Sequence, residues 1–191
     1  TVQWSDERGA WKRRSFVSRD ADVAVFELQA SSAGKLNCAI SLQMPAEMNF
    51  PKGLKTKCLH TKDYLNIRVN YAAPMDTIGY EGGIRVKQKG GSSFLRNDTL
   101  YIKDASEILL LSRTQKYPEN CGAEWNKGLL KKGLDAIRAN YNGLLKAHKA
   151  LHTSIYNRVR IDLGATPQER SLSNEELLEK QKNTDQPVLA L

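Results

Sequence analysis

Long hydrophobic runs are missing from this 191-residue sequence, and so are closely grouped metal ligands. No apolar stretch approaches the roughly 20 residues that a membrane-spanning helix needs, so we expect no membrane span. The three histidines are His60, His148 and His152, and no Cys-x-x-Cys pair occurs. Zinc and thioredoxin-type sites need tighter groupings than these. The sequence therefore predicts neither a metal site nor a cofactor.

Cysteine is scarce and odd in number, with Cys38, Cys58 and Cys121. Cys38 alternates with Leu36 and Ile40, which is typical of a small buried residue on a strand. A disulfide between Cys58 and Cys121 can form only in an oxidising compartment. The sequence leaves both states of this pair open.

Familiar catalytic motifs are also absent: there is no phosphate loop, no G-x-S-x-G and no H-E-x-x-H. Gly82-Gly83 and Gly90-Gly91 lack the strand-turn-helix context of a nucleotide fingerprint, so we expect both to be hairpin glycines. The acidic pairs Asp6-Glu7 and Glu175-Glu176 consist of adjacent residues, which point in different directions, and we interpret them as solvated charge. No catalytic residue is assigned.

The net charge of +8 raises the question of an anionic partner. The basic residues are scattered and are not interleaved with aromatics, as a strand-binding platform requires. We therefore expect no nucleic-acid partner. Trp4, Trp11 and Trp125 could stack on a sugar ring, but a tryptophan beside a β-sandwich is more often a core or rim residue, and we interpret them so.

The first part of the chain shows the period-2 alternation of half-buried strands. Polar turns separate these segments at Asp20–Asp22, at Ser31–Lys35 and at Lys89–Gly91, while Pro45–Lys57 is expected to be a loop. The predicted strands are Arg14–Arg19, Val23–Leu28, Leu36–Leu42, Leu65–Tyr71, Ile84–Val86, Leu100–Ile102 and Ile108–Leu111. Short strands at such regular spacing predict an antiparallel β-sandwich.

A helical pattern follows from about Asn126 to Val159. Its apolar positions recur in steps of three and four, which is one face of a helix. They are Leu130, Leu134, Ile137, Tyr141, Leu144, His148, Leu151 and Ile155, with six charged residues, Lys131, Lys132, Asp135, Arg138, Lys146 and Lys149, between them. The spacing predicts a single helix about 50 Å long. On that face His148 is expected to be a hydrogen-bonded core residue.

The remaining segment is expected to be an extended tail. Arg160–Leu163 is a short apolar-polar run before Gly164, and Thr166–Arg170 is interpreted as a loop. Ser173 with Glu176 forms a capping-box signature for a short helix. Val188–Leu191 is apolar and uncapped, which favours a segment whose continuation packs on something else.

Several of these segments, in this order, resemble glycoside hydrolase family 95, the α-L-fucosidases. The similar strands are Arg14–Arg19 (RSFVSR), Leu36–Leu42 (LNCAISL) and Leu100–Leu111 (LYIKDASEILLL). The linker helix and its exit resemble Tyr141–His148 (YNGLLKAH) and Tyr156–Gly164 (YNRVRIDLG). The resemblance extends over nearly the whole chain.

That resemblance implies an N-terminal super-β-sandwich, residues 1–118, which the chain enters partway, and a linker helix with a tail, residues 119–191. In the family these parts precede an (α/α)6 barrel that hydrolyses α-L-fucosides with inversion and holds the catalytic carboxylate. It implies a role in bracing that barrel and lining the rim of its cleft, with the barrel of the same polypeptide and an oligosaccharide as partners. A periplasmic or extracellular location is implied as well.

The match is incomplete at Leu151-His152, Tyr156 and Leu172–Leu177, where the family has other residues. These departures leave α-L-galactosides and other sugars open as substrates. The alternative function is a stand-alone carbohydrate- or protein-binding β-sandwich.

Overall fold

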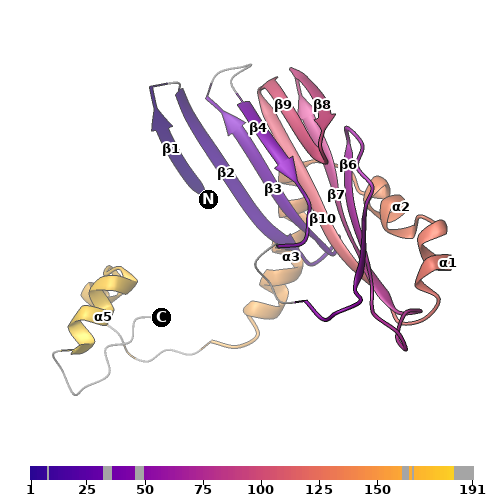
Figure 1. Ribbon diagram of the computed structural model, residues 1–191. Coiled ribbons are helices and arrows are strands. Elements are labelled where there is room, and N and C mark those ends of the chain that lie inside the picture. The colour runs from indigo at the N-terminus through magenta and orange to yellow at the C-terminus, as the bar shows by residue number, and fades with distance from the viewer. Residues whose placement is uncertain (8, 32–35, 46–49, 161–163, 165, 183–191) are drawn as a thin grey trace. The chain divides into compact units, whose positions relative to one another are not determined.

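The computed structural model describes residues 1–7, 9–31, 36–45, 50–160, 164 and 166–182 (Figure 1). Its contacts divide the chain into two compact units, Thr1–Leu151 and His152–Leu191. The first unit contains two antiparallel sheets and most of the helical residues. Among the described residues, no helix is both long enough and apolar enough to span a membrane.

In the described part of the chain ten strands form the two sheets, and every neighbouring pair is antiparallel. The large sheet has seven strands in the order β1 (Val2–Asp6), β2 (Gly9–Ser18), β3 (Val23–Ala30), β10 (Glu107–Tyr117), β7 (Gly79–Lys89), β6 (Tyr64–Asn70) and β5 (Lys55–Cys58). The small sheet has the order β4 (Leu36–Ser41), β9 (Thr99–Ala105) and β8 (Ser92–Arg96). The predicted antiparallel β-sandwich is confirmed, and helices follow it in the chain.

The two sheets share one hydrophobic core. Leu36, Leu100 and Ile102 of the small sheet meet Leu65 and Ile108 of the large sheet. All five residues are buried, with at most 5% of their surface exposed. The opposite face of the large sheet is covered by helices. Residues Ile108–Leu111 of β10 therefore pack on both faces of the sheet, which explains why this part of the strand is a continuous apolar run rather than an alternating one.

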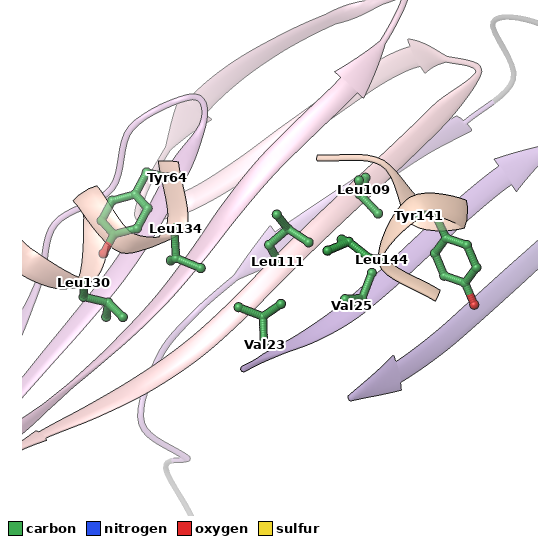
Figure 2. Close-up of a cluster of buried hydrophobic side chains, with 9 residues drawn as sticks. All are labelled: Val23, Val25, Tyr64, Leu109, Leu111, Leu130, Leu134, Tyr141 and Leu144. Carbon is green, nitrogen blue, oxygen red and sulfur yellow. The ribbon is translucent and has the colours of Figure 1, made fainter. Parts of the chain in front are cut away.

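Figure 2 shows the second core, which lies between the large sheet and helices α2 (Leu129–Ala136) and α3 (Tyr141–Tyr156). Leu130 and Leu134 of α2 and Tyr141 and Leu144 of α3 supply the helical side chains. The sheet contributes Val23, Val25, Tyr64, Leu109 and Leu111. Apolar burial on this scale is the main force that holds helices on a sheet.

The prediction of one helix from Asn126 to Val159 is wrong. The chain forms α1 (Cys121–Asn126), α2 and α3, and α3 with its 16 residues is about 24 Å long. Gly128 has φ of 61°, a left-handed conformation, and Ile137 is extended with ψ of 128°. Asn140 then begins α3, because its side-chain oxygen accepts the N–H of Gly143 at 2.7 Å. The apolar spacing continued across the break between α2 and α3 because both helices pack on the same sheet.

Among the other local predictions, some are confirmed and some are wrong. The six charged residues between the apolar positions are all exposed, as expected. Lys55–Lys57 belongs to strand β5 and not to a loop. The hairpin prediction is wrong for both glycine pairs: Gly82-Gly83 lies inside β7, and Gly90-Gly91, with φ of 71° and 68°, connects β7 to β8 of the other sheet. A one-turn helix, α4 (Pro167–Arg170), replaces the predicted loop because Thr166 and Glu169 form a capping box.

The capping box predicted for the last helix is present. The Glu176 N–H bonds to Ser173 Oγ at 3.3 Å and the Ser173 N–H to Glu176 Oε2 at 2.7 Å, which starts α5 (Asn174–Lys182). The predictions for Ser32–Lys35, for part of the Pro45–Lys57 loop, for Ile161–Leu163 and for Val188–Leu191 lie outside the described residues.

Candidate functional site

Two carboxylates are buried on the helix-covered face of the large sheet, and the sequence reading did not single out either of them. Glu81 on β7 is 2% exposed and Glu27 on β3 is 3% exposed. Burying an ionised carboxylate is costly unless it is paired and hydrogen-bonded. The alternation along β3 is the signal that could have revealed Glu27, because this residue stands in the same phase as Val23 and Val25, both of which point inward.

Glu81 is the centre of a hydrogen-bond network. Its Oε1 accepts from Asn66 Nδ2 at 2.8 Å and from Arg68 Nε at 3.1 Å, and its Oε2 accepts from the Tyr117 hydroxyl at 2.9 Å. Arg68 also donates through a terminal nitrogen to the carbonyl of Trp125 at 3.1 Å, and its guanidinium lies 5.6 Å from the centre of that ring. The network thereby ties α1 to the sheet.

The phenols around Glu81 are held in their neutral form. Burial, with the nearby Glu81 carboxylate as the next cause, raises the pKa of Tyr64 from 10.0 to about 12. Burial and the hydrogen bond to Glu81 also raise the pKa of Tyr117. A general acid or base works best with a pKa near the pH of the reaction. The two tyrosines therefore act as hydrogen-bonding supports rather than as proton-transfer groups.

Glu27 holds the other end of the helical layer. It accepts from Arg14 Nε at 2.6 Å, and the Arg14 guanidinium lies 4.0 Å from the centre of the Tyr141 ring. Phe16 meets the same ring edge to face, with centroids 5.3 Å apart. Cation–π and aromatic contacts of this kind add to the burial of the rings. Strands β2 and β3 are thereby joined to the start of α3.

His148 completes the contact between α3 and β2. Its ring lies 5.3 Å from that of Phe16, and its Nδ1 accepts the N–H of Arg19 at 3.3 Å. The hydrogen bond expected for His148 is present, but the residue is half-buried and not part of the core. His152, one turn later, is exposed and stacks on Tyr156 with centroids 5.9 Å apart.

Arg85 stabilises the break between α2 and α3. One of its terminal nitrogens donates to the carbonyls of Leu134 at 2.9 Å and Ile137 at 2.7 Å, and its Nε lies 3.5 Å from Asp135 Oδ1. The last carbonyls of a helix have no partners within the helix. The Arg85 guanidinium satisfies these carbonyls, and its positive charge is also attracted to the negative end of the helix dipole.

A second candidate is the groove beside Trp4 and Trp11. These two residues pair directly across β1 and β2, and their rings are nearly parallel, at 19°, with centroids 6.1 Å apart. They border a hollow of about 500 Å³, whose other lining residues are Gln3, Ser5, Ala10, Lys12, Gln29, Ala30 and Ser31. Trp125 is in the Glu81 network instead, so the structure brings two of the three tryptophans together.

The remaining predicted groups form no joint site. Within the described parts of the chain, no three His, Cys, Asp or Glu side chains are grouped so as to hold a metal ion. Asp6 ends β1, while Glu176 caps α5. Cys38, Cys58 and Cys121 are all free thiols, so the Cys58–Cys121 disulfide is absent from this structure.

The fold has relatives among solved structures. No curated protein sequence matches the chain. One similar solved structure is described as a kojibiose phosphorylase from the human microbiome, with 9% identity and a TM-score of 0.55. The match covers 81% of this chain and 22% of that protein, so this chain spans about a fifth of its length. At this identity the likeness shows the fold alone.

The family comparison is more specific. Residues 1–118 match the model of the glycosyl hydrolase family 65 N-terminal domain, which is more than half of the chain. The resemblance seen in the sequence is thus confirmed as that of a glycoside-hydrolase N-terminal β-sandwich, although the family found is number 65 and not number 95. The chain belongs to the glycosyl hydrolase family 65 N-terminal domain family.

Proposed function

We propose that this chain is a non-catalytic N-terminal part of a glycosidase that braces a catalytic (α/α)6 barrel in the same polypeptide. Membership of a glycosyl hydrolase N-terminal family supports this role. The buried carboxylates point the same way, because Glu27 and Glu81 are engaged by arginines under the helices. Ion-paired groups in such positions stabilise a packing arrangement rather than carry out chemistry on a substrate.

The apolar stripe of α3 is the observation that carries the proposal. Tyr141 and Leu144 are 7% and 8% exposed, because they pack on the large sheet. Leu151 and Ile155 continue the same three- and four-residue spacing but are 44% and 51% exposed. Exposed apolar surface in a row of this kind marks a contact with another protein surface. The catalytic barrel is the partner that the family context supplies.

The substrate class rests on sequence motifs. Segments such as Arg14–Arg19 and Leu100–Leu111 resemble those of inverting α-L-fucosidases, and the proposal therefore names an α-L-fucoside as the substrate of the parent enzyme. The differences at Leu151-His152 make an α-L-galactoside the second substrate to try. Lining of the cleft rim by a loop of the sandwich is part of the same proposal.

Expression of the complete reading frame tests the proposal. The full polypeptide should hydrolyse an aryl-α-L-fucoside, and NMR of the first product should show inverted anomeric configuration. The 191-residue chain alone should show no hydrolysis. A paired variant, Leu151→Glu with Ile155→Glu, should lower both the melting temperature and the activity of the full polypeptide, because it places charges in the proposed contact.

Two controls sharpen the result. Lys149→Glu changes a charge on the wet side of α3 and should leave activity unchanged. If the full polypeptide phosphorolyses kojibiose and does not act on fucosides, kojibiose would replace the α-L-fucoside as the proposed substrate. Hydrolysis by the 191-residue chain itself, or full activity of the paired variant, would contradict the bracing role.

A further inference from the structure

We propose that the groove beside Trp4 and Trp11 binds a neutral oligosaccharide, with a pyranose ring stacked on the exposed indole. Membership of a glycosyl hydrolase N-terminal domain family favours a sugar as the ligand. The inference does not depend on the bracing role. It concerns the opposite face of the large sheet and a different set of residues.

The position of the pair follows from strand register. Trp4 lies opposite Trp11, which in turn lies opposite Ala30, so these three residues share one face of the large sheet. Trp11 packs against the core between the sheets, together with Leu28 and Ala30. Trp4 belongs to β1, an edge strand whose five residues are all exposed, and the side chain of Trp4 keeps 44% of its surface in water.

Figure 1 shows the β1–β2 hairpin at the border of the large sheet. The large sheet has seven strands and the small one three. The inner face of the large sheet thus extends to an edge strand where Trp4 remains exposed. One indole of the pair is anchored by the core and the other is open, which gives a preformed platform. Preformed aromatic surfaces bind ligands at low conformational cost.

The chemistry of the groove favours an uncharged ligand rich in hydroxyl groups. Its volume of about 500 Å³ lies in the range of small-molecule sites. A pyranose presents an apolar face of C–H groups, which fits an indole, and a rim of hydroxyls, which need donors and acceptors. The Ser31 hydroxyl is among the lining groups and offers both, whereas the side chains of Gln3 and Gln29 alternate with those of Trp4 and Ala30 and point to the other face of the sheet. Lys12 is the one charged residue of this lining, so a phosphate group would find few cations.

Two other surfaces lack this combination. A hollow of about 580 Å³ beside α3 is lined by Ile137, Leu144 and Ala147 among others and contains no aromatic residue. Phe94 and Tyr101 stack at 5.2 Å on the small sheet, but the Lys103 ammonium lies 5.6 Å from the centre of the Phe94 ring. A cation in that position competes with a sugar for the ring face.

Tryptophan fluorescence and calorimetry on the 191-residue chain provide the test. The chain has three tryptophans, so Trp125→Phe leaves the groove pair as the only indole reporters. Maltotriose, cellotriose and fucosyllactose serve as probes at millimolar concentration. At least one of them should shift the emission of the Trp125→Phe protein and bind with measurable heat.

Trp4→Ala should weaken that binding about tenfold or more, since a central aromatic contributes much of the energy of a site. Trp4→Phe should weaken it less, which separates loss of the platform from loss of the fold, and circular dichroism should show native structure in both. Phe94→Ala, a matched exposed aromatic on the other sheet, should bind as the parent does.

Three results would overturn the proposal. The first is no binding of any probe by the folded parent chain. The second is equal binding by Trp4→Ala. The third is binding of adenosine monophosphate, but of no sugar, in the same groove. Because every measurement uses the 191-residue chain, a failure here leaves the bracing role untouched, and the reverse also holds.

Discussion

The hydroxyl of Tyr117 donates to the Glu81 carboxylate over 2.9 Å, at a point where the two residues are 3% and 2% exposed. Glu81 also pairs with Arg68, whose guanidinium reaches the carbonyl of Trp125 on α1. A single buried carboxylate thus links the end of β10, the middle of β6 and the first helix. Ion pairs and hydrogen bonds, as well as apolar packing, therefore hold the helices on the sheet.

Removal of the Glu81 carboxylate should therefore be costly. We expect Glu81→Ala to lower the free energy of unfolding by about 3–5 kcal/mol, because the buried Asn66 and Tyr117 and the partly buried Arg68 all lose their acceptor. Urea denaturation measures the change. Glu119→Ala, at an exposed position, is the control and should change stability by less than about 0.5 kcal/mol. Equal stability of the two variants would show that the network contributes nothing.

Alkaline pH should loosen the same region. The pKa of Tyr64 is raised from 10.0 to about 12, chiefly by burial and then by Glu81, so the folded state retains a proton that the unfolded chain loses. The resulting stability is complete below pH 10.0 and is lost as pH rises through about 12. Urea unfolding across that window should show falling stability in the parent and a shallower fall in Tyr64→Phe. An unchanged slope would exclude Tyr64 as a source.

The sandwich could be predicted because strand alternation is a local signal. Leu36, Cys38 and Ile40 repeat every second residue, and such a repeat needs no knowledge of partners. The breaks between the helices could not be predicted from a local repeat alone. Gly128 and Asn140 are a helix breaker and a helix N-cap that the sequence displays openly. The apolar spacing begins just after Gly128, at Leu130, and continues past Asn140, so it concealed the second break. That spacing reflects the sheet below the helices and not the continuity of one helix.

The site was harder to predict than the fold for a similar reason. A glutamate in a strand is ordinarily exposed. The arginines on neighbouring strands offset the cost of burying the Glu27 and Glu81 carboxylates. Arg14 is 13 residues from Glu27, and Arg68 is likewise 13 from Glu81. Such partners are set by register between strands, which the sequence does not state. The tryptophan pair is similar, since only the register of the β1–β2 hairpin brings Trp4 opposite Trp11.

Arg85 should prove essential for the end of α2. In Arg85→Ala the carbonyls of Leu134 and Ile137 lose a charged donor, and we expect a loss of about 1.5–3 kcal/mol for hydrogen bonds of this kind. Hydrogen exchange should show weaker protection of the amides in α2. Lys87→Ala, two residues along the same strand and exposed, is the control. Unaltered protection in Arg85→Ala would mean that α2 ends without its help.

Two glycines should respond in opposite directions to alanine. A Cβ at Gly83 would lie 2.6 Å from the Tyr64 hydroxyl and 3.0 Å from Leu130 Cδ2, so Gly83→Ala should cost about 1–3 kcal/mol by overpacking. A Cβ at Gly122, in α1, meets nothing within 4 Å, so Gly122→Ala should gain about 0.4–1 kcal/mol from reduced freedom of the unfolded chain. Thermal unfolding of both variants decides; the same sign for both would contradict the packing described here.

Two leucines of α3 should separate its packing within this chain from its proposed packing on a catalytic domain. Leu144 is 8% exposed in the core under the helix, so Leu144→Ala should cost about 2–5 kcal/mol in the 191-residue chain. Leu151 is 44% exposed, so Leu151→Ala should change the stability of that chain by less than about 0.5 kcal/mol.

The complete polypeptide should give a different order for the second variant. If the exposed stripe contacts a catalytic barrel, Leu151→Ala creates a cavity there and should lower the melting temperature, while Lys149→Ala on the wet side should not. Calorimetry of both proteins, each with both variants, makes the comparison. A Leu151→Ala variant that is neutral in the complete polypeptide as well would leave the stripe in water, and the bracing role would then lose the surface on which it depends.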